Sequence, residues 1–314
     1  MKNGTRFPAL LLRFLAVALV AIAGSSQGCA PARTGVQPAP LRGHLVIVGG
    51  GPIPDAITRR FVDLAGGRGK ARIAVLPMAS SLARTGPEKA AELRALGADA
   101  FVLNVNRAEA DADSVVKSLE SVSGIWFSGG DQSRIMTALG GTRSALAIRN
   151  RYLGGAVIGG TSAGAAVMSA SMITGDERRM GGDRPPSDSS QAYITIDRDN
   201  VVTTEGLGLI AGAIIDQHFV RLKRQNRLVS LVLENPVQLG VGIDESTAIF
   251  VRPDGQWDVA GASVVVIFDA RGGSVTPTGT TLGAADVRMH LLPSGSLFDP
   301  RSGKVVRLGG APPP

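Results

Sequence analysis

The sequence predicts an α/β fold in which helices cover both faces of a mostly parallel sheet, followed by a β-rich C-terminal extension. Two observations support this prediction. Short, continuously apolar segments alternate with helical segments along most of the chain, as they do in parallel sheets that are buried on both faces. The composition, with 44% hydrophobic and 19% charged residues in 314 positions, is typical of a globular chain with a sizeable core.

The expected elements follow one another in a regular order. Strands are expected at residues 44–48, 72–76, 100–104, 124–127 and 156–159, with helices at 87–96 and 112–119. Further strands are expected at 210–215, 239–243 and 247–251, a helix at 220–233, and a hairpin at 257–268. Residues 176–200 are polar and contain prolines, and we interpret them as a long loop. Chemistry in open parallel sheets collects beyond the carboxyl ends of the strands, so a site is expected there.

The first 28 residues have the pattern of an export signal. Lys2 and Arg6 form a basic start, and the apolar stretch from Phe14 to Ala23 is short for a membrane span. Cys29, the only cysteine, follows this stretch, and the segment resembles a bacterial lipoprotein signal. We therefore expect lipid attachment at Cys29, which would anchor the protein to a membrane of the bacterial cell envelope. Ordinary cleavage of the leader, giving a soluble periplasmic or secreted protein, is the alternative.

The rest of the composition excludes some classes of partner. The formal net charge is +7, but the basic residues are scattered and form no run with interleaved aromatic residues, so no nucleic-acid partner is expected. No group of ligand residues has the spacing of a metal site, and neither a metal nor another cofactor is expected. The glycines at 49, 50 and 51 follow the first expected strand, but they lack the spacing of a dinucleotide-binding turn.

Residues 160–164 have the pattern of a nucleophile elbow. Ser162 lies between small residues, after the apolar segment 156–159 and before an expected helix. A serine on such a sharp strand-to-helix turn is held in strained backbone geometry, with its hydroxyl clear of the sheet. The first N–H groups of the helix then point toward an oxyanion formed at the same place. Ser162 is therefore the candidate nucleophile.

A serine nucleophile needs a base, and the chain holds three histidines. His218 ends one expected strand and begins a helix, so it lies at the same edge of the sheet as Ser162. His44 begins the first strand, at the opposite edge. His290 has the pattern of a half-exposed strand histidine in the C-terminal extension. We therefore choose His218 as the base.

A carboxylate must orient the imidazole of the base. Glu245, directly after the expected strand 239–243, is our choice. Its neighbour Asp244 is expected to point away or to cap a turn. Asp176 and Glu177, at the head of the polar loop, are the competing carboxylates, and the sequence does not decide between them and Glu245.

The backbone N–H groups of Gly130 and Ala163 are the candidate oxyanion hole. Ala163 directly follows the nucleophile, and Gly130 follows the expected strand 124–127. A glycine there is compatible both with a plain turn and with a backbone donor site, because each requires the absence of a side chain.

Four segments resemble cyanophycinase and the dipeptidase E-like serine peptidases of family S51. They are residues 127–132, 160–165, 216–219 and 242–245, which come in the order and approximate spacing of that family. The resemblance runs from about residue 44 to residue 268. It implies the fold of class I glutamine amidotransferases, a flavodoxin-like arrangement, and it implies Ser162 as nucleophile and His218 as base. The expected organisation is a leader (1–28), a flexible tether (29–42), a catalytic domain (43–270) and a β-rich extension (271–314).

The resemblance also implies a substrate pocket. Its members would be Gln132, Asp216, Gln217 and arginines of the helix after His218. The family pattern has arginines four, six and nine residues after the histidine, and this sequence has Leu222, Arg224 and Arg227 there. Arginine binds carboxylates with two parallel hydrogen bonds. The loss of the first arginine leaves the peptidase chemistry intact and puts cyanophycin itself in doubt.

Three functions fit these observations to different degrees. The first is a serine peptidase that cleaves cyanophycin, a poly-aspartate with arginine on the β-carboxyls, or another acidic or β-aspartyl peptide. The second is an α/β-hydrolase esterase, which would take His290 as its base, with Asp269 or Asp286. The third is a binding lipoprotein without turnover, against which the set of Ser162, His218 and Glu245 argues. For the oligomeric state, the sequence is compatible with a homodimer.

Overall fold

The computed structural model describes residues 1, 43–178 and 195–310, and within these ranges nine strands form one large sheet in the order β17-β16-β11-β10-β1-β5-β4-β2-β3. Five of them are parallel: β1 (His44–Val48), β2 (Arg72–Leu76), β3 (Asp99–Val102), β4 (Gly124–Phe127) and β5 (Val157–Thr161). The others join on antiparallel: β10 (Thr247–Val251), β11 (Trp257–Gly261), β16 (Leu297–Asp299) and β17 (Lys304–Arg307). The predicted α/β fold with its mostly parallel central strands is confirmed.

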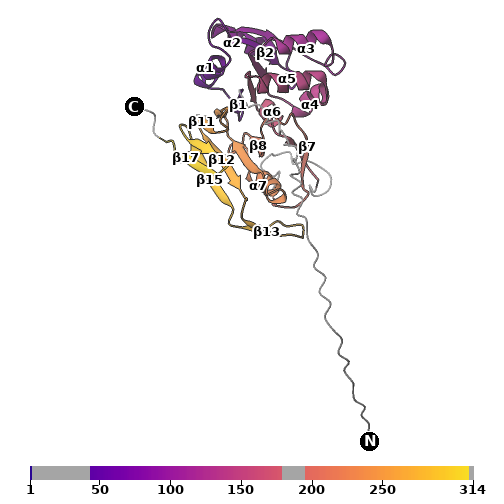
Figure 1. Ribbon diagram of the computed structural model, residues 1–314, viewed down its shortest axis with the longest axis vertical. Coiled ribbons are helices and arrows are strands. Elements are labelled where there is room, and N and C mark those ends of the chain that lie inside the picture. Colours follow the sequence, from indigo (N-terminus) through magenta and orange to yellow (C-terminus); the bar gives the residue numbers. More distant parts are fainter. Residues whose placement is uncertain (2–42, 179–194, 311–314) are drawn as a thin grey trace, which may run out of the picture. The chain divides into compact units, whose positions relative to one another are not determined.

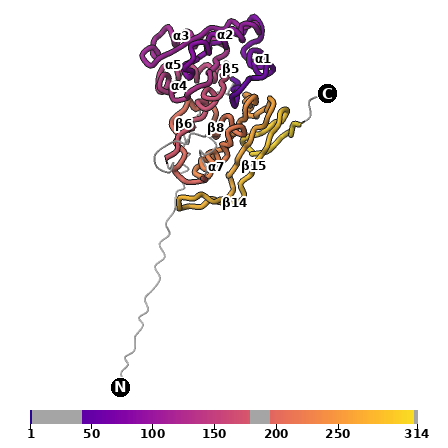
Figure 2. Tube along the Cα trace, turned by 180° about the vertical axis from the view of Figure 1, so that it is seen from behind, coloured from indigo at the N-terminus to yellow at the C-terminus, as the bar shows by residue number. Residues whose placement is uncertain are grey.

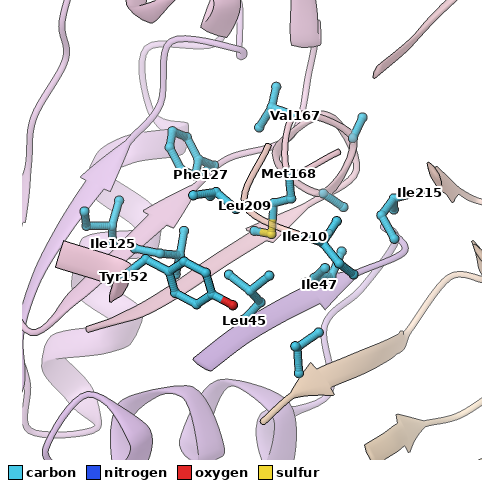
Figure 3. Close-up of a cluster of buried hydrophobic side chains, with 14 of the residues drawn as sticks. Leu45, Ile47, Ile125, Phe127, Tyr152, Val167, Met168, Leu209, Ile210 and Ile215 are labelled. Atoms are coloured by element: carbon cyan, nitrogen blue, oxygen red, sulfur yellow. The ribbon is translucent and has the colours of Figure 1, made fainter. Parts of the chain in front are cut away.

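Helices cover both faces of the parallel strands because alternate residues of each strand are apolar on opposite sides. They are α1 (Asp55–Leu64), α2 (Thr85–Ala95), α3 (Asp113–Glu120), α4 (Gln132–Leu139) and α5 (Arg143–Leu153). On one face, Val46 and Val48 of β1 belong to the same core cluster as Phe61 of α1. On the other face, Leu45 and Ile47 of β1 belong to a cluster that includes Tyr152 of α5, and Figure 3 shows part of it.

A second sheet carries two of the expected strands. It has the order β15-β12-β9-β8 and consists of β8 (Ala213–Gln217), β9 (Leu239–Ile243), β12 (Val264–Asp269) and β15 (Arg288–Pro293). Helix α7 (Gln225–Glu234) lies next to these strands in both views (Figures 1 and 2). A Cβ on Gly240 would lie 2.4 Å from the side chain of Val232. The glycine therefore lets α7 approach β9 closely.

Two expectations for this region are wrong. The expected hairpin at 257–268 does not form, because β11 pairs with β10 in the large sheet and β12 pairs with β9 in the second sheet. The expected helix at 220–233 begins only at Gln225. The residues before it form a tight turn, in which the N–H of Leu222 donates to His218 O at 2.8 Å and Lys223 has a left-handed backbone with φ 52°. A left-handed residue cannot continue a right-handed helix.

The remaining elements are short. A four-residue helix α6 (Ala163–Ala166) follows β5, and β6 (Ser171–Glu177) pairs with β7 (Val201–Glu205). Part of the expected loop at 176–200 is therefore strand, and part of it lies outside the described residues. Strands β13 (Ser274–Val275) and β14 (Ala284–Ala285) form a small hairpin.

The C-terminal extension is divided between the two sheets. Strand β15 pairs with β12 in the second sheet, and β16 pairs with β11 in the large sheet. The leader 1–28, the tether 29–42 and Cys29 lie outside the described residues, apart from residue 1. In the part of the chain that the structure describes, no helix has the length and apolar character needed to cross a membrane.

Candidate active site

Ser162 occupies a strained turn between β5 and α6. Its backbone has φ 54° and ψ −112°, a conformation that non-glycine residues rarely adopt. Its N–H donates to Val48 O at 3.1 Å, and its carbonyl accepts from the N–H groups of Ala165 and Ala166. A Cβ on Gly160 would lie 2.3 Å from Gly164 O. The turn that the sequence predicts is thus present, and it can close only with glycine at this position.

His218 lies beside Ser162 at the end of β8. Its Nε2 is 2.8 Å from Ser162 Oγ, and its Nδ1 is 2.8 Å from Glu245 Oε1. The His218 and Glu245 side chains are 21% and 31% exposed, so both are reachable from solvent. The structure brings together the three side chains that we chose as nucleophile, base and orienting carboxylate. This arrangement can transfer a proton from the serine hydroxyl to an oriented imidazole.

The competing carboxylates are engaged elsewhere or exposed. Glu177 Oε1 accepts from Asn200 Nδ2 at 3.1 Å. Asp176, its neighbour in β6, is exposed. Asp244 accepts from the backbone N–H groups of Val220 and Arg221 at 3.1 and 2.9 Å, so it caps the turn after His218. Glu245 is therefore the carboxylate that the structure places on the imidazole.

His290 lies in β15, where it pairs with Ile267. Its ring lies 5.4 Å from that of Phe298, and burial together with the charge of Arg288 lowers its pKa. His44, at the other end of β1 from the turn that holds Ser162, also has a pKa lowered by burial. Since Ser162 Oγ lies against His218, the esterase alternative, which requires a Ser162–His290 pair, does not fit this geometry.

The glycines after β1 form the backbone wall of the site. The N–H of His218 donates to Gly49 O at 2.7 Å, and that of Ser246 donates to Gly50 O at 2.9 Å. A Cβ on Gly50, whose φ is 109°, would lie 2.2 Å from His218 Cε1, and one on Gly51 would lie 2.9 Å from Glu245 Cβ. We assigned no role to these glycines from the sequence. The feature that could have revealed their role is the run of three glycines at the carboxyl end of the first strand.

The candidate oxyanion donors lie beside Ser162. A Cβ on Gly129 would lie 3.3 Å from Ser162 Cβ, so this segment passes directly alongside the serine. Gly130 has φ 139°, and a Cβ there would lie 2.2 Å from Ala79 O. The backbone N–H groups of Gly130 and Ala163 donate to no carbonyl of the described residues. Two such N–H groups can receive a negative charge that develops on a carbonyl oxygen.

Gln132, an expected substrate residue, is committed to the neighbouring strand. It is 8% exposed, and its Nε2 donates to Ile173 O and Thr174 O at 2.8 and 2.7 Å. Its amide nitrogen therefore anchors β6. A substrate contact of this side chain stays a prediction.

Asp216 and Arg227 form a buried ion pair. Arg227 Nε donates to Asp216 Oδ2 at 2.7 Å, and Arg227 Nη2 donates to Asp216 Oδ1. The two residues are 0% and 3% exposed. Asp216 also accepts from the N–H of Gln217 at 2.8 Å and lies 3.8 Å from Arg224 Nη1. Direct contact of either buried side chain with substrate stays a prediction.

Arg224 is partly exposed, whereas Gln217 beside it is buried. Arg224 Nη1 donates to Gln217 O at 2.7 Å, and the Arg224 side chain is 21% exposed. Gln217 directly precedes His218, and its side-chain oxygen is buried without a partner in the described part of the chain. The resemblance implies that both residues contact substrate, and this stays a prediction.

The comparisons with known proteins agree on one family. A model described as peptidase family S51 matches residues 45–257. A cyanophycinase of Nostoc sp. is 36% identical over 77% of this chain and 79% of its own, and one of Geminocystis herdmanii is 33% identical over 82% and 94%. The crystal structure of a peptidase from an acI-B1 Actinobacterium matches with a TM-score of 0.60 and 22% identity, covering 83% of this chain and 98% of that one. This last match supports the fold alone.

Proposed function

The chain belongs to peptidase family S51 and is a serine-type peptidase, and from this premise we propose that Ser162, His218 and Glu245 carry its hydrolysis. The observation that carries the proposal is the continuous chain of two hydrogen bonds, each 2.8 Å, from the serine through the imidazole to the carboxylate. Each atom in it has the distance and the chemical type that its role requires.

The proposed reaction passes through an acyl-enzyme. His218 Nε2 takes the proton of Ser162 Oγ as the oxygen attacks the substrate carbonyl carbon, and Glu245 holds the proton on Nδ1. The carbonyl oxygen gains a negative charge, which the N–H groups of Gly130 and Ala163 receive. The C–N bond then breaks, and His218 returns the proton to the departing amine. Water, deprotonated by the same imidazole, hydrolyses the ester in the reverse sequence of steps.

We propose a β-aspartyl peptide, with cyanophycin as the polymeric candidate, as the substrate class. The names of the relatives support this choice. Arg221 and Lys223, both exposed, and the partly exposed Arg224 place positive charge on the turn that follows His218, where a substrate carboxylate would be attracted. The resemblance implies three arginines that would bind the polymer. Leu222 stands at the first of these positions, and Arg227, at the third, is buried. Short β-aspartyl peptides are therefore the stronger candidates.

The test is a digest of cyanophycin and of a panel of β-aspartyl dipeptides, with products identified by mass spectrometry. We expect Ser162→Ala to lower the rate by ~10⁴-fold, since removing one member of such a unit typically has this effect. His218→Ala should be equally damaging, and His290→Ala should keep nearly the wild-type rate. Wild-type activity in Ser162→Ala, or a larger loss from His290→Ala than from His218→Ala, would contradict the mechanism.

We also propose export to the bacterial cell envelope with a lipid on Cys29, on the strength of the leader pattern alone. Incorporation of radiolabelled palmitate should then depend on Cys29. Label that persists in Cys29→Ser would exclude this residue as the attachment site. A soluble product that begins near Gly24 would favour ordinary cleavage of the leader.

A further inference from the structure

The carboxylate of Asp244 is the centre of a hydrogen-bond cluster directly behind the catalytic histidine. Its Oδ1 accepts from the N–H groups of Val220 and Arg221 at 3.1 and 2.9 Å, and its Oδ2 accepts from Ser263 Oγ at 2.7 Å. Asp244 is 8% exposed. A buried carboxylate is costly unless it is hydrogen-bonded, and here three donors from two segments of the chain satisfy it.

The turn that Asp244 caps holds His218 in an unfavourable backbone conformation. His218 has φ 50°, and a non-glycine residue persists there only where its surroundings fix it. The N–H of His218 donates to Gly49 O at 2.7 Å, and its carbonyl accepts from Leu222 at 2.8 Å. Asp244 takes two N–H groups of the same turn, those between His218 and Leu222. The left-handed conformation of His218 is thus fixed from both sides.

The same cluster reaches the backbone of Glu245, the residue whose carboxylate contacts the imidazole. Asp244 directly precedes Glu245, so the two acidic side chains share one stretch of backbone. Thr247 Oγ1 donates to Glu245 O at 3.1 Å and accepts from the N–H of Ser263 at 2.9 Å. Ser263, in turn, donates its hydroxyl to Asp244. A displacement of the Asp244 carboxylate would therefore move the His218 turn and the Glu245 backbone relative to each other.

We propose that Asp244 is a positioning residue, which sets the distance and angle between His218 and Glu245 through the backbone on either side of them. This inference rests on the proposed serine mechanism. It assigns the neighbouring carboxylates separate tasks: Glu245 touches the imidazole, and Asp244 fixes the frame in which that contact is made. Loss of the frame should affect the reactivity of Ser162 more than the affinity for substrate, because misplacement of a catalytic group by about 1 Å can lower a rate by ~10²-fold.

The experiment measures Ser162 reactivity without relying on any substrate. A fluorophosphonate probe labels a serine that an imidazole activates, and the rate is followed by mass spectrometry of the intact full-length chain. The hydrogen bond between His218 and Glu245 is read separately, as a low-field proton resonance in the NMR spectrum that disappears in His218→Ala. We expect Asp244→Ala to slow labelling by about 10²-fold and to shift or remove this resonance. On the best peptide substrate, kcat should fall while KM stays close to the wild-type value.

Asp299 offers a matched control. Its carboxylate accepts from the backbone N–H of Arg301 at 3.0 Å and from the hydroxyl of Ser302 at 2.7 Å, but it is half-buried and lies in β16. Asp299→Ala should keep the wild-type labelling rate and the wild-type resonance. Asp244→Asn should keep most of the activity, because an amide oxygen still accepts the N–H groups of Val220 and Arg221.

The remaining outcomes either support or contradict the positioning role of Asp244. If Asp244→Ala does not fold, Ser263→Ala becomes the test, with an expected loss of about fivefold, the rate equivalent of one hydrogen bond. Wild-type labelling in a folded Asp244→Ala or in Ser263→Ala overturns the inference, as does an Asp244→Asn variant that is as slow as Asp244→Ala. A wild-type chain whose Ser162 does not react with the probe contradicts the proposed mechanism instead. The low-field resonance still tests the positioning role in that case.

Discussion

Two arginines separated by three positions have different surroundings in this structure. Arg227 is buried against Asp216, whereas Arg224 is partly exposed and donates to the carbonyl next to His218. A buried ion pair adds little net stability over an apolar pair, but removing one partner leaves an uncompensated buried charge. Loss of Arg227 should therefore lower the stability of the fold, whereas loss of Arg224 should weaken substrate binding.

Arg227→Ala should act on stability. We expect the free energy of unfolding to fall by about 1–3 kcal/mol, because among the described residues the buried Asp216 carboxylate keeps only the N–H of Gln217 and the more distant Arg224, whose Nη1 is 3.8 Å away. Urea denaturation followed by circular dichroism measures the change. The double variant Asp216→Asn with Arg227→Met should recover much of the loss, since it removes both charges. A cost below about 1 kcal/mol for the single change would show that the pair is not buried in solution.

Arg224→Ala should act on substrate binding. We expect KM for a β-aspartyl peptide to rise by roughly tenfold to a hundredfold with little change in kcat, since a hydrogen bond to a charged group contributes about 1.5–3 kcal/mol. Arg224→Lys should restore only part of the affinity, because an ammonium group cannot form the paired hydrogen bonds of a guanidinium. An unchanged KM on every acidic peptide would remove Arg224 from the binding site.

The sequence identified the candidate nucleophile and base but not the burial of their neighbours. Ser162 stood in a recognisable turn, and strand order left His218 as the histidine at the correct edge. The choice of Glu245 over Asp176 and Glu177 could not be made from the sequence, because it depends on how distant segments meet. The pattern of arginines after His218 is the same whether they are exposed or buried. Their environments depend on how each arginine lies relative to Asp216 at the end of β8.

At the scale of elements, the loop after β1 determines whether the site can form. The loop gives its carbonyls to His218 and Ser246, and its Cα atoms leave no room for side chains next to His218 and Glu245. The sequence indicates a glycine-rich turn there, but it does not indicate what the turn contacts. The contacts that require glycine come from residues far along the chain.

Gly50→Ala should abolish activity. The added methyl group would lie 2.2 Å from His218 Cε1, and the backbone has φ 109°, so the imidazole must move away from Ser162. We expect a loss of at least about 10²-fold in kcat, since misplacing a catalytic group by about 1 Å has this effect. The measurement is hydrolysis together with the thermal midpoint of unfolding.

Gly279→Ala is the control for backbone strain. Gly279 also has a left-handed φ, 94°, but a Cβ there meets nothing within 4 Å. The control should lose some stability and keep its activity. If Gly50→Ala is no less active than Gly279→Ala, the contact with the imidazole does not limit the reaction.

The strands of the parallel half were predicted more successfully than those of the C-terminal half. Strands such as β1, β4 and β5 are apolar except for His44 at the start of β1 and Thr161 at the end of β5, and they lie between covered faces, so the sequence pattern alone identifies them. The segments 257–261 and 264–269 also have strand character, and a short connection favoured a hairpin. In the structure they lie in different sheets, because 257–261 pairs with β10 and 264–269 pairs with β9, and both partners precede them in the chain.

At the scale of the whole molecule, Asp269 of β12 and His290 of the C-terminal extension contribute a pH dependence to stability. Burial and the charge of Arg288 lower the pKa of His290. Burial alone would raise the pKa of Asp269, but its hydrogen bonds and ion pairs with Arg271 and Arg288 outweigh burial and lower it. Both groups bind protons more readily in the unfolded chain, so acid favours unfolding.

Stability should therefore fall in two stages on acidification. The contribution of His290 is complete above about pH 6.5, its unfolded pKa, and is lost below that value. The contribution of Asp269 is complete above about pH 3.9 and is lost as the pH falls further. Urea titrations at a series of pH values measure both stages. His290→Phe should reduce the slope just below pH 6.5, to which His44 also contributes because burial lowers its pKa, and should leave the lower stage. An unchanged slope in this variant would show that His290 does not titrate on unfolding.

The position of β1 between β5 and β10 has a consequence for the order in which the molecule is made. Ser246 donates its hydroxyl to Pro52 O across 194 residues of sequence, and β10 closes the last open side of β1. A chain emerging from the ribosome therefore exposes its nucleophile long before the carboxylate that orients the base has been synthesised. In an N-terminal fragment that ends before β10, β1 would be the open edge of the sheet, next to the strand β5 that leads to Ser162. If Glu245 orients the base as proposed, hydrolysis can begin only after residue 245 has been synthesised, when almost the entire catalytic domain is complete.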